Sequence, residues 1–341
     1  MRNLFATQAE AAGLIRSGAV LVVAGAEALL MGSPRGRWVG GTTAYFIADG
    51  GGTSDTTHLF CSVIDAAEDA RVVVLPPDQL GHVTAGRYAN GFSYLLLPAR
   101  SEAHRRYALE APGFPGLYDQ PLMGWIAGVH LDEIGRSAAK VVDGSTGMAF
   151  DNAGAALHVQ LPSRLAAEVD IVNIFSPGDG PAIVFPGTGF SVNACTLDGK
   201  PGSFARAIAE SGGDMRLPLV ADYAGAMINV SIQSVDAGTG EVQLYAPVVA
   251  GETYHLARPI ADIGAAYSAG VGAPDGAGNM LSCNCILNFL YAGLEGKRTG
   301  GFVGPVTFGE IAYNLVNQTL VHLELTEVPG SPELLPAWSA S

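Results

Sequence analysis

The segment that decides the fold of this chain lies in its last fifth and reads Gly301-Phe-Val-Gly-Pro-Val-Thr-Phe-Gly-Glu-Ile-Ala-Tyr-Asn-Leu-Val-Asn-Gln-Thr-Leu-Val-His-Leu-Glu-Leu325. Its glycines predict a bent loop, and the alternation of apolar residues after Thr319 predicts a strand. Glu310 stands between two apolar runs, directly after a glycine. It is therefore either a turn residue or a group that a ligand contacts.

Short apolar runs separated by turn residues continue outward from this segment over the rest of the chain. There are 45 glycines and 20 prolines among 341 residues, without a repeat, which predicts many short strands joined by tight turns. Helix signals are fewer. Thr7 and Glu10 have the spacing of a capping box ahead of a first helix, and a second helix is expected over 101–109. Asp198-Gly199 predicts a type I′ hairpin.

The order of the expected elements determines the fold class. We predict a short helix over 162–168, a strand over 170–175, and a segment over 281–294 that begins as a strand and ends as a helix. Helices do not alternate strictly with strands, which argues against a doubly wound sheet or a TIM barrel. We therefore predict an α/β (α+β) fold of mixed, mostly antiparallel sheets flanked by helices, in two lobes. The expected lobes are residues 1–168 and 169–328, with a tail over 329–341.

Composition excludes several classes of function. The chain has 32 acidic and 18 basic residues and a net charge of −14, which argues against binding to the phosphates of nucleic acids. The best apolar run, Ala19 to Met31, is interrupted by Glu27 and is shorter than the roughly 20 residues that a membrane span needs. No signal peptide is evident. Four cysteines in a chain of this length do not indicate a disulfide scaffold. We expect a cytoplasmic protein with free thiols.

Four motifs follow one another in the second half of the chain. They are Asn193-Ala-Cys-Thr-Leu-Asp-Gly-Lys-Pro201, Leu217-Pro-Leu-Val220, Val248-Val-Ala-Gly-Glu-Thr-Tyr-His-Leu-Ala257 and Gly304-Pro-Val-Thr-Phe-Gly-Glu-Ile311. This order resembles the FIST family of bacterial sensory domains, and the last motif is similar to the Gly-Phe-x-x-x-Gly-Glu-Ile motif that closes them. The resemblance covers roughly residues 170–325. It implies recognition of small ligands such as amino acids, and of haem in some members.

The resemblance is weaker elsewhere. Trp38-Val-Gly-Gly-Thr-Thr-Ala44 lies where the FIST N-terminal half has a turn rich in glycine, cysteine, serine and threonine. Asn288 stands where FIST domains commonly have an arginine, so an anion-binding role for this position does not transfer.

Three short stretches supply the candidate ligand-binding residues, which are Gly40, Gly41, Thr42, Thr43, Asn284, Cys285, Gly309 and Glu310. The first stretch offers successive backbone N–H groups that can form an anion-binding nest, or a simple glycine turn before a strand. The Glu310 carboxylate can accept from a ligand ammonium or amide at a pocket mouth, or can be an exposed turn acid. Asp222 and Tyr223 can line a pocket, although turn chemistry accounts for most loop acids.

The two cysteines Cys283 and Cys285 are the alternative chemical centre. On a strand their i, i+2 spacing places both thiols on the same side. They are most simply small buried hydrophobic residues, and a nucleophilic role requires a histidine brought close by the fold, with His255 and His322 as the available partners. The histidines show no metal-binding spacing, so no metal site is predicted, and haem ligation by one axial histidine stays open.

These observations favour a stand-alone cytoplasmic protein that is not an enzyme. We expect it to bind a small polar, amino-acid-like metabolite in a cleft between two lobes and to pass a signal to a separate protein. The alternatives are a cysteine-dependent small hydrolase or transferase using Cys283 or Cys285, and a haem-binding gas sensor.

Overall fold

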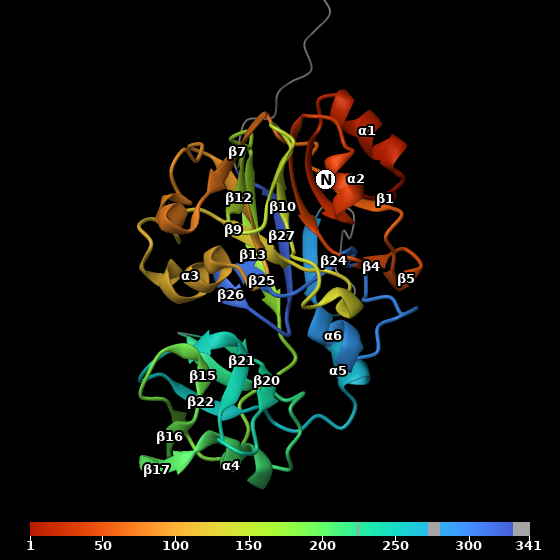
Figure 1. The fold of residues 1–341 in the computed structure, drawn as a ribbon. Coiled ribbons are helices and arrows are strands. Elements are labelled where there is room, and N and C mark those ends of the chain that lie inside the picture. The colour runs from red at the N-terminus through yellow and green to blue at the C-terminus, as the bar shows by residue number, and fades with distance from the viewer. Residues whose placement is uncertain (224, 272–279, 330–341) are drawn as a thin grey trace, which may run out of the picture.

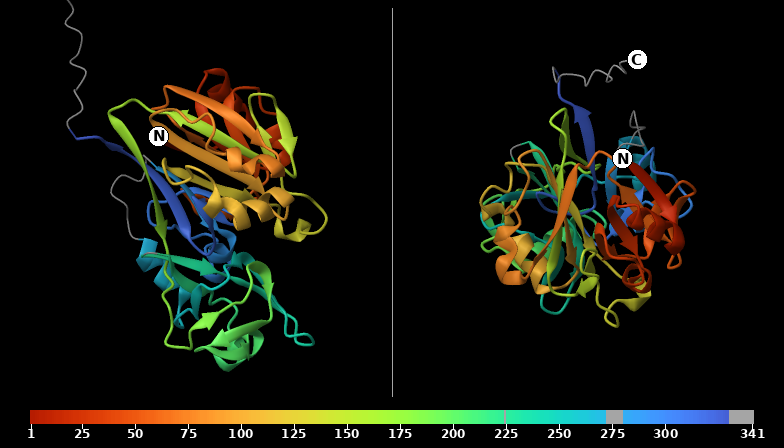
Figure 2. Two further views of the ribbon diagram at one scale, coloured as in Figure 1. Left: turned by 90° about the vertical axis from the view of Figure 1, so that its left-hand side faces the viewer. Right: turned by 90° about the horizontal axis from the view of Figure 1, so that it is seen from above.

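The structure is a computed structural model that describes residues 1–223, 225–271 and 280–329 (Figure 1). It consists of a large body and a small body, and Figures 1 and 2 show the small body hanging below the large one. Here the small body means Ile183 to Leu256, and the large body means the remaining strands and helices.

The large body contains three six-stranded sheets. The first sheet has the order β1 (Arg2–Ala6), β6 (Leu59–Val63), β2 (Val20–Gly25), β3 (Arg37–Thr42), β10 (Val141–Asp143) and β11 (Met148–Phe150). The second has the order β26 (Asn314–Val316), β25 (Glu310–Ala312), β9 (Leu122–Ala127), β8 (Gly91–Pro98), β12 (Gly154–Gln160) and β7 (Asp69–Leu75). The third has the order β13 (Leu165–Val172), β27 (Leu320–Glu327), β23 (Met280–Cys285), β24 (Gly304–Thr307), β4 (Tyr45–Ala48) and β5 (Gly51–Ser54).

The small body contains two further sheets. One has the order β17 (Lys200–Ser203), β16 (Ala194–Leu197), β14 (Ile183–Val184), β22 (Thr253–Leu256), β18 (Leu219–Tyr223) and β19 (Ala226–Val230). The other has the order β15 (Gly189–Val192), β21 (Val242–Val248) and β20 (Ile232–Val235). Of the strand pairs in the described ranges, β2–β3, β8–β9 and β23–β24 are parallel and the others antiparallel. The predicted α+β class with mostly antiparallel sheets is confirmed.

Short helices pack around the sheets. They are α1 (Gln8–Arg16), α2 (Glu27–Met31), α3 (Glu102–Glu110), α4 (Phe204–Glu210), α5 (Ile263–Val271) and α6 (Ile286–Tyr291), with 3₁₀ turns at Pro77–His82, Ala111–Gly113 and Leu131–Glu133. Within the part of the chain that the structure describes, no helix has the length and apolar character needed to cross a membrane.

Local sequence signals predicted several elements correctly. Thr7 and Glu10 make the reciprocal bonds of a capping box at the start of α1. Asp198 and Gly199 both have positive φ, 49° and 78°, in the tight turn between β16 and β17, as a type I′ hairpin requires. The expected strand that turns into a helix is β23 followed directly by α6.

The helix predicted over 162–168 is wrong. Residues from Leu165 onward belong to β13, which pairs along its whole length with β27. Ala166, Ala167 and Glu168 have good helix propensity, but their backbone groups lie beside a strand from the end of the chain. Pairing with that strand overrides the local preference.

Strands from the two ends of the chain share sheets in the large body. β25 pairs with β9, and β24 pairs with β4, so residues after 300 complete sheets that start before 130. The expected lobe boundary between residues 168 and 169 falls inside β13. Of the expected tail over 329–341, residues 330–341 lie outside the described residues.

One apolar core cluster continues from the large body into the small body. It includes Tyr107, Ile126 and Ile311 from the large body together with Phe204 and Tyr254 from the small body, all at most 1% exposed. A second cluster fills the space between the sheets of the large body, around Trp125. The two bodies are therefore joined by packed apolar side chains as well as by the chain itself.

Candidate functional site

Glu310 is the most unusual ionisable residue near the centre of the fold. It is the first residue of β25, where it pairs with Trp125 on one side and Val316 on the other, and its side chain is 0% exposed. Thr319 Oγ1 donates to Glu310 Oε2 over 2.8 Å, and the Thr319 N–H approaches the same oxygen at 3.4 Å. The reading of Glu310 as an exposed turn acid is wrong, because tertiary pairing buries it.

The surroundings of Glu310 favour its protonated form. Thr307 Oγ1 lies 3.2 Å from Glu310 Oε1, and it also lies 3.1 Å from the Gly309 carbonyl oxygen and 3.3 Å from that of Asn284. The single hydroxyl hydrogen of Thr307 can be donated to only one of these three oxygens at a time. If Glu310 is protonated, it can donate to Thr307 Oγ1, and the Thr307 hydroxyl is then free to donate to a carbonyl oxygen. Burial raises the pKa of the Glu310 carboxyl to about 8, against the opposing effect of the bonds from Thr319 and Thr307.

Asn284 and Cys285 lie close to Glu310, around Thr319. The Cys285 N–H donates to the Thr319 carbonyl, and Asn288 Nδ2 donates both to that carbonyl, over 3.0 Å, and to Asn284 Oδ1, over 3.1 Å. The structure therefore brings Asn284, Cys285, Gly309 and Glu310 together. They form a buried polar cluster, and Asn284 Nδ2 and Asn288 Oδ1 have no hydrogen-bond partner among the described residues.

Gly40, Gly41 and Thr42 do not form an anion-binding nest. All three lie in β3, between β2 and β10, so their backbone groups belong to sheet ladders. The Thr42 N–H donates to the Lys140 carbonyl and the Thr43 N–H to the Gly25 carbonyl. The glycines are needed for packing, because a Cβ at Gly41 would overlap the ring of Trp125 and one at Gly40 would lie 2.8 Å from that of Trp38. The nest prediction is wrong, and Thr43 instead donates to the Val306 carbonyl over 2.7 Å.

The two cysteines lie on β23, each 1% exposed. Burial raises the pKa of both thiols well above the ordinary value, and the nearby Glu310 carboxyl raises it further. A nucleophilic cysteine needs the opposite change. His322 pairs with Ser282 and so lies on the other face of the sheet from both thiols. His255 belongs to the small body, where its ring bonds to the Gly180 carbonyl. The geometry does not support the cysteine-dependent alternative.

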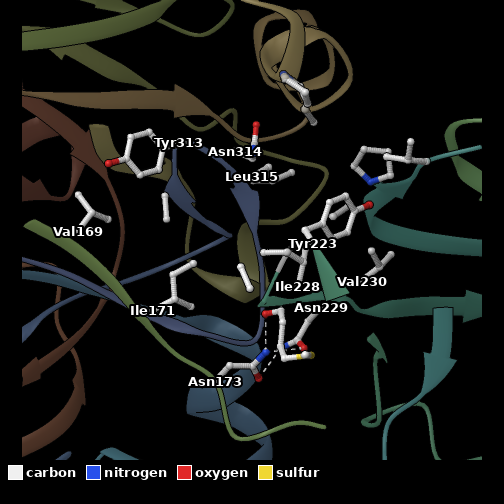
Figure 3. A pocket seen from close by; sticks show the side chains of 18 of the residues that line it. Val169, Ile171, Asn173, Tyr223, Ile228, Asn229, Val230, Tyr313, Asn314 and Leu315 are labelled. Atoms are coloured by element: carbon white, nitrogen blue, oxygen red, sulfur yellow. Dashed lines mark hydrogen bonds between the residues drawn. The ribbon is translucent and has the colours of Figure 1, made fainter. Parts of the chain in front are cut away.

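A large cleft lies where the small body meets the large body (Figure 3). Its volume is about 820 Å³. Apolar side chains contribute most of its wall, among them Val169 and Ile171 of β13, Ile228 of β19 and Leu315 of β26. A cleft of this size with a mainly apolar wall is typical of a small-molecule site.

Polar groups lie at two ends of this cleft. At one end Asn229 Nδ2 donates to Asn173 Oδ1 over 3.0 Å, and Asn173 Nδ2 donates to the Met227 carbonyl over 3.0 Å. At the other end Asn314 Nδ2 donates to the Tyr118 hydroxyl over 3.0 Å. Neutral amide and phenol groups therefore supply the hydrogen-bonding capacity.

Charge in the cleft is sparse and of one sign. Asp170 is the one Asp, Glu, Lys or Arg residue among the described residues that line it, and its side chain is 78% exposed. No histidine is among them, so the haem alternative gains no support from this site. No group of three or more His, Cys, Asp and Glu side chains within the described ranges is placed to hold a metal ion.

None of the eight predicted ligand-binding residues lines the cleft. The link between the two places is the turn between β26 and β27. Asn229 Nδ2 also approaches the carbonyl oxygens of Asn317 and Gln318, each at 3.3 Å, and the next residue is Thr319, which holds Glu310. The buried polar cluster around Glu310 thus contacts the turn between β26 and β27, and Asn229 at one end of the cleft bonds to the same turn.

Sequence reasoning anticipated Tyr223 as a pocket residue, and it does line the cleft. It missed Asn173, Asn229 and Tyr313. Asn173 lies inside the strand expected over 170–175 and Asn229 lies in β19, and an asparagine within a strand leaves no distinctive local pattern. Tyr313 has a φ of 59° between two strand residues. This left-handed backbone conformation is uncommon for a tyrosine and is not predicted by the local sequence.

Comparison with protein-family models matches residues 6–326 to DUF6976, a family of unknown function. The match includes all the residues on which the FIST resemblance rested, so the assignment to the FIST family is wrong. Neither the curated proteins nor the solved structures contain a match. Because the family model spans most of the chain, this protein belongs to DUF6976.

Proposed function

We propose that this protein binds a small amphipathic molecule, without negative charge, in the cleft between its two bodies. The observation that carries the proposal is the cleft itself, which has a volume of about 820 Å³ and a mainly apolar wall. Amide and phenol groups lie at its ends, and no Lys or Arg is among the described residues that line it. A bound carboxylate or phosphate would lie there without a cationic partner, at a desolvation cost that the site does not offset.

This proposal narrows the amino-acid-like ligand expected from the sequence. A free amino acid carries a carboxylate, for which the wall offers no counter-charge, whereas an amide or an amine suits Asn173, Asn229 and Asp170. The sensory role and the separate signalling partner rested on the FIST resemblance and are not part of the proposal.

The direct test uses a matched pair of probes and a matched pair of variants. Hexanamide and hexanoate have the same chain length and differ at the end group, so isothermal calorimetry should detect saturable binding of the amide and weaker binding of the carboxylate. Ile228→Trp places a large ring in the cleft from a half-buried position, and Val328→Trp adds the same ring at an exposed position outside it.

The proposal predicts that Ile228→Trp abolishes binding of the amide and of Nile red, a neutral apolar dye, while Val328→Trp retains both. Equal binding by the two variants would show that the probes do not occupy the cleft. Preference for hexanoate over hexanamide would contradict the argument from charge.

A further inference from the structure

The cleft lies where three sheet edges meet. β13, β19 and β26 each stand at the end of the strand order of their own sheet. Successive residues of these strands line the cleft, as in Val169, Asp170 and Ile171 of β13. Successive side chains of a strand point to opposite faces of its sheet. Because three successive residues of β13 line the cleft, the cleft lies against the edge of this strand rather than against one face of the sheet.

β13 is the longest of these edges and has a regular register. It spans eight residues, none of them buried, and pairs with β27 without a bulge. The Val328 N–H donates to the Arg164 carbonyl over 2.8 Å, which indicates that the even-numbered residues of β13 make the bonds to β27. The N–H and C=O groups of Leu165, Ala167, Val169 and Ile171 then point away from the sheet.

Three of these outward groups already have partners within the chain. The Leu165 N–H donates to the Pro162 carbonyl over 2.9 Å, and the Leu165 carbonyl accepts from Asn90 Nδ2 over 3.1 Å, so the edge open to a further strand runs from Ala167 onward. The Ile171 N–H donates to Asp170 Oδ1 of the neighbouring residue over 2.8 Å. On the facing edge, the Met227 carbonyl takes Asn173 Nδ2. Side chains thus occupy positions where an added strand would place its own backbone, and no proline or lysine protects the outer edge of β13.

The charges on β13 indicate the chemistry of a partner strand. Its charged side chains are Glu168 and Asp170, both exposed and on the same face, and Glu168 stands directly opposite Glu324 of β27. Like charges in direct cross-strand register are unfavourable, and basic side chains on a further strand would offset them. On the other face, the apolar side chains of β13 pack against the core of the large body and continue into the cleft.

We propose that the ligand of the cleft is an extended peptide that adds to the outer edge of β13, with apolar side chains alternating with basic ones. The peptide backbone pairs with the outward groups of Ala167 and Val169 in β13. Its apolar residues continue the face of Val169 and Ile171, and its basic residues lie beside Glu168 and Asp170. A second copy of this chain is a poorer occupant, because strand-to-strand pairing of two β13 edges would bring the carboxylates of both copies onto one face. The inference rests on the proposed function of the cleft and specifies its ligand.

The test uses a labelled, end-capped peptide of eight residues that alternates valine and lysine, followed by fluorescence anisotropy. The control peptide has the same sequence with alternate backbone amides methylated on the edge that pairs, so that charge and side chains are unchanged. We expect saturable binding of the unmethylated peptide. The methylated peptide should bind at least about tenfold more weakly, since each lost backbone hydrogen bond contributes up to about a factor of ten in affinity. A valine–glutamate peptide should not bind.

Two protein variants complete the design. Ala167→Pro removes an outward N–H without a bond to β27 and should weaken the valine–lysine peptide about tenfold while hexanamide still binds. Glu168→Gln lies outside the cleft wall and should reduce both the affinity and its salt dependence. Circular dichroism verifies folding, and the methylated peptide tests the same bond on unmodified protein.

The possible results separate the two proposals. Equal binding of the methylated and unmethylated peptides would overturn strand addition. Electrostatic attraction would then be the remaining explanation of peptide binding. Binding of hexanamide and Nile red without peptide binding would overturn the peptide inference and keep the cleft function, whereas no binding of any probe would overturn both. A dimer in sedimentation that Ala167→Pro dissociates would identify a second copy as the occupant and refute the peptide.

Discussion

Replacing Glu310 by glutamine is expected to stabilise this protein by an amount that grows as pH rises. Glutamine has the shape of the protonated carboxyl: its amide N–H can donate to Thr307 Oγ1 and its carbonyl oxygen can accept from Thr319. The substitution therefore keeps both hydrogen bonds of a fully buried side chain and removes only the capacity to ionise.

The magnitude follows from the difference in pKa between the unfolded and folded chain. Burial raises the pKa from 4.5 to about 8, so between these values the unfolded chain releases a proton that the folded protein retains. The contribution of Glu310 to stability is complete below about pH 4.5 and is lost as pH rises to about 8. Each pH unit in this window costs about 1.4 kcal/mol, which amounts to on the order of 4 kcal/mol between pH 5 and pH 8.

The assay is urea unfolding followed by tryptophan fluorescence at several pH values, with the difference between the Glu310→Gln variant and wild type plotted against pH. Trp125 pairs with Glu310 across β9 and β25 and reports on its surroundings. The other ionisable groups cancel in the difference. Glu327→Gln, which removes the same charge at an exposed position, should give a flat line. A flat line for Glu310→Gln as well, or a ¹³C NMR titration of Glu310 with its midpoint below pH 5, would refute the reasoning.

Three further results are expected. Gly41→Ala forces a methyl group into the ring of Trp125 and should cost about 1–3 kcal/mol or more, whereas Gly187→Ala, where a Cβ has open space, should leave the melting temperature nearly unchanged. All four cysteines are buried free thiols, so reaction with Ellman's reagent at pH 7.5 should be slow in native protein and fast in urea; one rapidly reacting thiol in native protein would contradict this. Asn229→Ala removes the fully buried amide that donates to the Asn317 and Gln318 carbonyls, and should lower the unfolding free energy by about 1–3 kcal/mol in a denaturation series. An unchanged midpoint would disprove this loss.

The parts of the fold that were predictable depend on residues close together in sequence. The capping box of Thr7, the hairpin at Asp198-Gly199 and the strand-to-helix change in 281–294 all involve a few neighbouring residues whose backbone preferences agree. The helix expected over 162–168 failed because the partner that makes this segment a strand is β27, more than 150 residues later.

The candidate site was predictable to a smaller extent. Asn284, Cys285, Gly309 and Glu310 do come together, because they lie on strands that meet at Thr307 and Thr319. The glycine stretch before Thr43 was misread, since the two tryptophan rings that require glycine there come from other parts of the sheet system. The sequence analysis expected a cleft between lobes over 1–168 and 169–328, whereas the cleft in the structure lies between the large body and the small body of Ile183 to Leu256. Of its lining residues, the sequence analysis named Tyr223.

The sequence by itself determined the class of the fold and the local turns. Composition and local pattern carry that information, because each turn or cap is set by a few adjacent residues. The tertiary structure alone decided that Glu310 is buried, that the glycines serve packing, and that β13 is an edge strand beside the cleft. Each of these depends on which distant segment lies opposite a residue, and strand pairing across 150 or more residues leaves no mark on either strand alone.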